Sequence, residues 1–129
     1  MKSFSTLIVI PVYLFITLTA TSCPSTTDPL FVKCWANSFE EEGQDNIRIY
    51  RPCATHTFMA ARYRSTFTLK ETGEAEYSVL APNDAHTTAQ GVWSYDAKTK
   101  KLIFREKNGN IVMEYEVVEI GEDVLKLKK

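Results

Sequence analysis

The feature that most constrains this chain is the alternation of apolar and polar residues after residue 60, interrupted by short turns. The clearest example is the segment 63–70, in which Tyr63, Phe67 and Leu69 share one face and polar residues occupy the other. Successive side chains of a β-strand point to opposite faces, so this spacing predicts strands with one buried face. No helical period stands out after residue 30, and we therefore expect an all-β domain.

The turn that follows this segment predicts how the strand pairs. A three-residue loop, Glu71–Gly73, with Gly73 in the left-handed conformation is a common hairpin connection. A register shifted by one residue would set Leu69 against Glu76 and expose the apolar face, so the three-residue loop is favoured. The expected pairs are Lys70–Glu74, Leu69–Ala75, Phe67–Tyr77 and Ser65–Val79.

Three later turns predict hairpins with the same inner face. They are a four-residue loop at Ala97–Lys100, the dipeptide Asn108–Gly109 and a loop around Gly121. The expected apolar pairs are Trp93–Phe104, Tyr95–Leu102, Phe104–Met113, Leu102–Tyr115, Val117–Leu125 and Tyr115–Leu127, with Glu116 beside Lys126 and Glu114 beside Lys128 on the outer face. Four independent turns thus agree on one buried face, and this consistency supports the assignment of the strands.

Two earlier segments, Phe31–Phe39 with Trp35 and Asn46–Tyr50 with its isoleucines, bring the total to about eight antiparallel strands in an up-and-down meander. Eight strands close a small barrel, and closure removes exposed sheet edges. An open curved sheet or a two-sheet sandwich is the alternative. The longest segments outside strands are Pro52–Ala61, with a helical turn at 57–61, and Pro82–Thr88.

Residues 1–22 have the character of a signal peptide. Lys2 precedes an uncharged apolar run, Leu7–Leu18, and small residues follow up to Cys23. A run of about 12 apolar residues is too short to cross a hydrocarbon core, which takes about 20. A buried helix or strand of the domain is the alternative interpretation of this run.

The small residues before Cys23 resemble the export signal of bacterial lipoproteins, in which that Cys becomes the lipidated N-terminus. The resemblance implies lipidation at Cys23, a short polar tether over residues 23–29 and a domain over residues 30–129. It also implies attachment to a membrane at the bacterial cell envelope. Cleavage at the same bond by an ordinary signal peptidase is the alternative, and it would leave a periplasmic or secreted protein.

Three cysteines would leave one thiol unpaired in an exported protein. If Cys23 carries lipid, Cys34 and Cys53 remain. A disulfide between them would close a loop of about 20 residues, which contributes roughly 3 kcal/mol in the chain-entropy model. The alternative is that both cysteines stay unpaired and act as small apolar residues.

The anchored export signal, Trp35, the eight-strand meander and the segment Gly91–Asp96 (GVWSYD) together resemble the small lipocalin-like lipoproteins of bacteria. Lipocalins proper carry Gly-x-Trp on the first strand, and Lys33 stands in the place of that Gly. The resemblance implies a small barrel that binds a ligand, and we expect a binding protein rather than an enzyme.

Two groups of side chains are candidates for binding. The first is four of the five arginines, which either form the rim of the barrel mouth and bind an anion or are neutralised by nearby glutamates on the outer face: Arg48, Arg51, Arg62 and Arg64. The second is the inward aromatic residues, which either line a cavity for a small apolar molecule or fill the core: Trp35, Phe67, Tyr77, Trp93, Tyr95, Phe104 and Tyr115.

Other kinds of function receive little support. The net charge of −1 argues against nucleic-acid binding. No catalytic motif or phosphate-binding glycine loop is present. His56 and His86 lie in the two long segments outside strands, and nothing brings them together as metal ligands, so we expect no metal and no cofactor. A module with a solid core that binds a protein partner through these two segments is the alternative function.

Overall fold

A computed structural model describes residues 28–83 and 85–129. The expected signal peptide, the lipidation site Cys23 and residues 23–27 of the expected tether lie outside the described residues.

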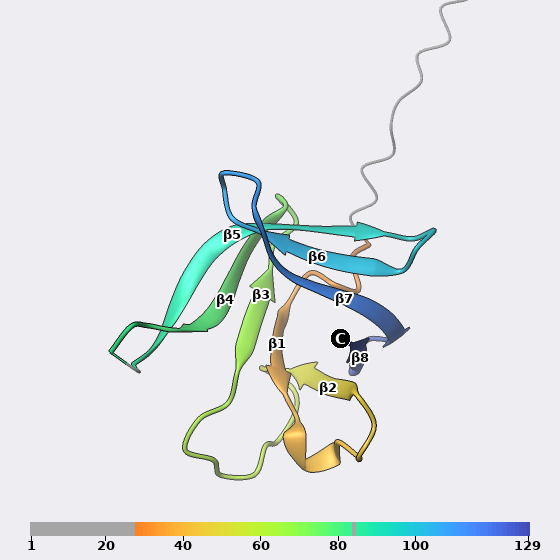
Figure 1. Cartoon of the computed structure of the whole chain (residues 1–129). Coiled ribbons are helices and arrows are strands. Elements are labelled where there is room, and N and C mark those ends of the chain that lie inside the picture. The colour runs from red at the N-terminus through yellow and green to blue at the C-terminus, as the bar shows by residue number, and fades with distance from the viewer. Residues whose placement is uncertain (1–27, 84) are drawn as a thin grey trace, which may run out of the picture.

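The described chain forms a closed barrel of eight antiparallel strands, as the alternation predicts (Figure 1). The barrel is neither the open sheet nor the sandwich. One short 3-10 helix, η1 (Phe39–Glu41), follows the first strand. The strands are β1 (Cys34–Asn37), β2 (Ile47–Pro52), β3 (Thr66–Leu69), β4 (Glu74–Leu80), β5 (His86–Asp96), β6 (Lys101–Arg105), β7 (Ile111–Ile120) and β8 (Leu125–Lys128).

The order of strands around the barrel follows the chain from β3 to β8, and the first hairpin closes the ring. β1 lies between β2 and β3, while β2 pairs with β8. Because β2 and β3 are both antiparallel to β1, they run in the same direction on either side of it. The connection between them, residues 53–65, must therefore pass from one end of β1 to the other. We call residues 53–65 the crossover segment.

The apolar pairs predicted for three hairpins are confirmed. In the β6–β7 hairpin the ladder shifts between Phe104 and Arg105, and Glu106 bonds to Asn110, so its loop has three residues and not the predicted two. Gly73 has a φ of +90°, and the Lys70 amide bonds to the Glu74 carbonyl across the first turn. Short turns determine register locally, which explains why sequence alone predicted it. The confirmed apolar pairs are Phe67–Tyr77, Leu69–Ala75, Trp93–Phe104, Tyr95–Leu102, Phe104–Met113 and Leu102–Tyr115.

The register predicted between β7 and β8 is wrong. The ladder shifts between Val117 and Glu119, so the strand carries an extra residue that alternation alone does not reveal. The predicted pairs with Leu125 and Leu127 and the two predicted charge pairs are thereby replaced. The observed pairs are Glu116–Lys128, Val117–Leu127, Glu119–Lys126 and Ile120–Leu125, and the ion pairs are Lys126–Glu119 and Lys101–Glu114.

Several predicted boundaries also differ. The strand predicted over 31–39 is reduced to β1, because turns occupy residues 29–31 and η1 follows β1. No helical turn forms at 57–61, where the Met59 carbonyl accepts a bond from Arg64 rather than from a helical amide. β5 begins at His86, so that residue lies in a strand and not in a loop over 82–88.

The barrel interior is filled by side chains. Phe104 is fully buried, and its ring lies 5.2 Å from Phe67 and 5.9 Å from Tyr77. Of the seven predicted inward aromatics, Tyr95 and Tyr115 are half-buried, and the other five are buried. These contacts match the filled-core interpretation of the aromatic residues.

Phe31 is a core residue that the alternation did not identify. It is fully buried, with its ring 4.6 Å from Tyr95, and its carbonyl accepts a bond from the Trp35 indole at 3.0 Å. This residue precedes β1 and packs against the barrel core from outside the strand pattern.

Candidate functional site at the barrel mouth

The crossover segment begins at a disulfide between Cys34 and Cys53, whose Cα atoms are 5.4 Å apart. The Cys53 amide also donates to the Cys34 carbonyl at 3.0 Å. Trp35 is fully buried, and the neighbouring Cys34 is only partly buried. The bridge therefore fastens the segment to β1 next to the barrel core.

Arg64 holds the other end of the crossover segment. Its guanidinium forms a two-pronged pair with Glu40 on η1 and donates to the Met59 carbonyl at 2.9 Å. The same group lies 4.7 Å from the Phe39 ring and 4.6 Å from the Phe58 ring. The hydrogen bonds from Arg64 lower the pKa of Glu40 to about 2. Arg64 is thus fully engaged in fixing the segment.

Arg51 is engaged in the same way. Its Nε and Nη2 atoms donate to the two carboxylate oxygens of Glu41 at 2.9 and 2.8 Å, and Nη1 donates to the Asp123 carbonyl. These bonds lower the pKa of Glu41 to about 2. Arg62 is exposed on the crossover segment and forms no ion pair within residues 28–83 and 85–129.

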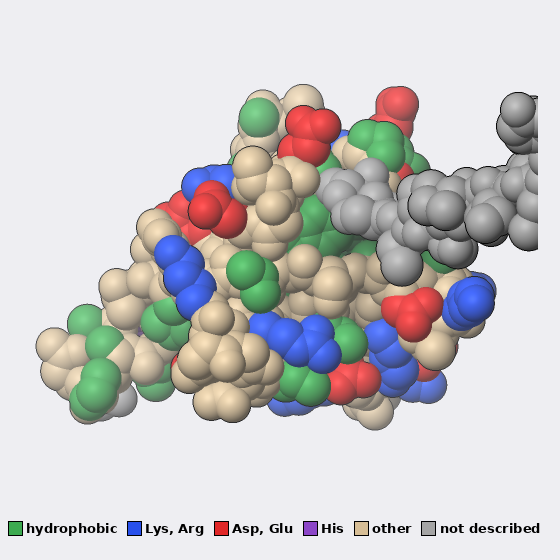
Figure 2. All heavy atoms as spheres, turned by 90° about the horizontal axis from the view of Figure 1, so that it is seen from above, with side chains coloured by type: hydrophobic (Ala, Val, Ile, Leu, Met, Phe, Trp, Pro, Cys, Tyr) green, Lys and Arg blue, Asp and Glu red, His purple; other side chains and the backbone are tan. Residues whose placement is uncertain are grey.

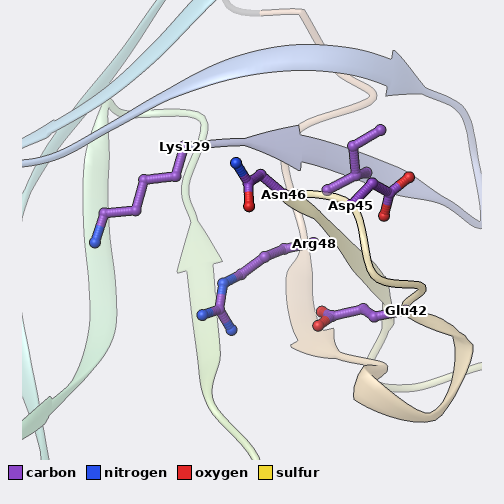
Figure 3. A pocket seen from close by; sticks show the side chains of 6 residues that line it. Glu42, Asp45, Asn46, Arg48 and Lys129 are labelled. Atoms are coloured by element: carbon purple, nitrogen blue, oxygen red, sulfur yellow. The ribbon is translucent and has the colours of Figure 1, made fainter.

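Arg48 has different surroundings from the other three predicted arginines. It shares the inner register of β2 with the buried Tyr50, and it is paired across the ladder with Leu127, which is fully buried. Its guanidinium enters a surface hollow of about 390 Å³ at one end of the barrel (Figure 3). The hollow is lined by Glu42, Asp45, Asn46, Ile47, Arg48 and Lys129.

The two cations of this hollow extend in the same direction. Figure 3 shows the side chains of Arg48 and Lys129 projecting to one side, while the Asp45 carboxylate points the opposite way. The Glu42 carboxylate accepts bonds from the Asn37 side-chain amide and from the backbone amide of Ile49. Among the described residues, Arg48 has no ion-pair partner.

The charge of Arg48 acts on two phenols, Tyr50 on the same face of β2 and Tyr115 on β7. Burial raises the pKa of both Tyr50 and Tyr115, and the positive charge of Arg48 opposes that rise at each. Both hydroxyls therefore stay protonated at neutral pH, and Tyr115 donates to the Met113 sulfur at 3.4 Å. A cation beside protonated hydroxyls favours an anionic group. We call Arg48, Tyr50, Met113, Tyr115 and Lys129 the mouth cluster.

The isoleucines of the strand expected over Asn46–Tyr50 do not mark its inner face. Ile47 and Ile49 are only half-buried, whereas Tyr50 and Pro52 are the buried members of β2. Tyr50 is the residue in the sequence that indicates the inner face. If its aromatic ring is buried, Arg48, two positions earlier, lies on the same face of the strand. No sequence pattern predicts a role for Lys129, because it approaches Arg48 only at the end of the folded barrel.

The remaining candidates lie apart from the mouth cluster. Cys53 is in the disulfide, the His56 ring packs on Phe58, and the His86 ring stacks on Tyr63 at 3.6 Å. Within the described parts of the chain, no group of three His, Cys, Asp or Glu side chains is placed to hold a metal ion.

Comparisons with known proteins provide no relative, so the function is inferred from the site itself. In the portion of the chain that the structure covers, no helix is both long and apolar enough to span a bilayer. No protein-family model, curated protein or solved structure matches this chain.

Proposed function

We propose that this protein is an exported, lipid-anchored, lipocalin-like binding protein of the bacterial cell envelope that holds a small amphipathic anion at its barrel mouth. The observation that carries the proposal is Arg48. It is the arginine with an inward register, a hollow beside it and no ion pair among the described residues. The closed eight-strand barrel and the uncharged apolar run before Cys23 support the same assignment.

The ligand is expected to sit at the mouth rather than deep in the barrel. The aromatic rings around Phe104 fill the centre, so a ligand would have to displace core contacts to enter it. Met113 and Tyr115 are half-buried against the core, and the positive charge of Arg48 acts on the Tyr115 hydroxyl. A molecule with a compact apolar body and one anionic group meets both features.

The test compares two probes that differ by one charged group. These are 8-anilino-1-naphthalenesulfonate and N-phenyl-1-naphthylamine, which lacks the sulfonate. We expect the sulfonate probe to bind and Arg48→Gln to weaken its binding about tenfold, because a charge-assisted hydrogen bond is lost at a partly solvated site. Fluorescence titration measures both affinities.

The matched control is Arg62→Gln, which removes the same charge from an exposed position outside the mouth cluster. It should leave the affinity for the sulfonate unchanged, and neither variant should alter binding of the uncharged probe. Equal affinities for the sulfonate in wild type and Arg48→Gln, or no binding of it at all, would exclude the proposed anion site.

The anchor is tested separately. Cells that express the protein should incorporate an alkyne-labelled fatty acid into it, and Cys23→Ala should abolish the label because the acylated side chain is gone. Gel fluorescence after click labelling measures the incorporation. Label that persists in Cys23→Ala would refute lipidation at this residue, and total protein on the same gel serves as the control.

A further inference from the structure

Within residues 28–83 and 85–129, the outer half of β5 presents a free strand edge. β5 pairs with β4 from His86 to Val92, but its pairing with β6 covers only Val92 to Asp96. β4 and β5 therefore leave the barrel together as a two-stranded arm, with β5 on the outer side (Figure 1). Figure 2 shows the arm projecting from the body, with apolar side chains at its tip, where Leu80 is 61% exposed.

The hydrogen bonds of the hairpin identify which backbone groups line this edge. The Ala81 amide bonds to the Ala85 carbonyl, and in an antiparallel ladder bonded pairs alternate with non-bonded ones. The odd residues of the arm, such as Thr87 and Ala89, therefore bond to β4. The N–H and C=O groups of His86, Thr88 and Gln90 face the other way, toward the free edge.

Nothing in this stretch protects the edge. Natural proteins block free edges with charged side chains, proline or bulges. Residues 85–92 contain no Lys, Arg, Asp, Glu or Pro, and His86, Thr88 and Gln90 are all exposed. An unprotected edge with β-forming threonines favours the addition of another strand.

We propose that the free edge of β5 pairs with the same edge of a second copy of this chain. A two-fold antiparallel arrangement centred on Thr88 sets that residue opposite its own copy, with His86 opposite Gln90 of the partner subunit. Every edge donor then meets an acceptor, and no like charges face one another. A second copy of the chain fits this edge, because rotation about Thr88 places its backbone donors opposite acceptors and its uncharged side chains opposite one another.

The interface is short, so association is weak in solution and requires a high protein concentration. Sedimentation equilibrium of the purified protein, from micromolar to millimolar, should show a reversible monomer–dimer equilibrium. Amide hydrogen exchange locates the contact. The amides of His86, Thr88 and Gln90 should gain protection as concentration rises. The amides of Thr87 and Ala89, already bonded to β4, should not change.

Two variants disrupt the free edge at a residue whose backbone groups do not bond to β4. Thr88→Pro deletes a donor that does not bond to β4, and Thr88→Lys places like charges opposite each other at the two-fold axis. Each should weaken dimerisation by roughly ten- to a hundredfold. Thr99→Lys, at an exposed turn position far from the edge, is the matched control and should dimerise like wild type.

Each outcome of these experiments either supports or overturns edge pairing. A wild-type protein that stays monomeric up to millimolar concentration overturns the proposal. So does a dimer that both Thr88 variants leave intact, since another surface then joins the copies. Should the variants fail to fold, the exchange pattern of the wild type decides alone, because protection confined to the even residues requires edge pairing. None of these measurements involves the anion site at the mouth cluster.

Discussion

Gly91→Ala should lower the free energy of unfolding by about 3 kcal/mol or more. A Cβ atom at this position would lie 2.2 Å from the Arg105 carbonyl oxygen and 3.2 Å from the Tyr77 ring. The carbonyl belongs to the β6 backbone, which pairs with β5 at Val92, so it cannot withdraw without disturbing the ladder. Gly91 is the residue at which β5 leaves β6 and continues into the arm.

Urea unfolding monitored by tryptophan fluorescence measures this effect. Gly121→Ala is the matched control, because the nearest atom to its added Cβ is 3.6 Å away, an ordinary contact. The control should change the free energy of unfolding by less than about 1 kcal/mol. Equal midpoints for the two variants would show that the Arg105 carbonyl does not constrain position 91.

Phe104→Ala is the second large effect, with an expected loss of about 3–5 kcal/mol in the free energy of unfolding. Phe104 is fully buried, and its ring contacts the rings of Phe67, Tyr77 and Tyr115. Truncation removes these contacts to β3, β4 and β7 and leaves a cavity that the closed ladder cannot collapse to fill.

The same urea titration compares Phe104→Ala with Ile111→Ala, which truncates an apolar side chain that is 54% exposed on β7. The control should lose less than about 1 kcal/mol. A loss at Phe104 no greater than at Ile111 would mean that the interior is not filled, and a ligand would then not be restricted to the mouth.

The hairpins show how much of the fold local sequence determines. Gly73 sets the turn between β3 and β4, and the pairing of Phe67 with Tyr77 follows from it without information from elsewhere in the chain. The β7–β8 hairpin could not be predicted in the same way. Its shift between Val117 and Glu119 gives β7 an extra residue that the turn residues do not specify.

The candidate site was predictable only in part. The cluster of arginines is plain in the sequence, but their separate roles are not. Arg51 and Arg64 are occupied because η1 brings Glu41 and Glu40 to them. Arg48 shares the inner register of β2 because Tyr50, rather than the neighbouring isoleucines, is buried, and its own side chain is exposed at the barrel end. Each outcome depends on contacts between segments, which residue types alone do not specify.

By itself, the sequence determined that this protein is all-β, with eight strands and one aromatic inner face, because alternation and turn residues act over a few positions. The tertiary structure decided that β1 lies between β2 and β3, and it decided which arginine reaches the barrel mouth. It also left the outer edge of β5 uncovered. These features depend on the pairing of segments far apart in the chain, for which no local preference exists.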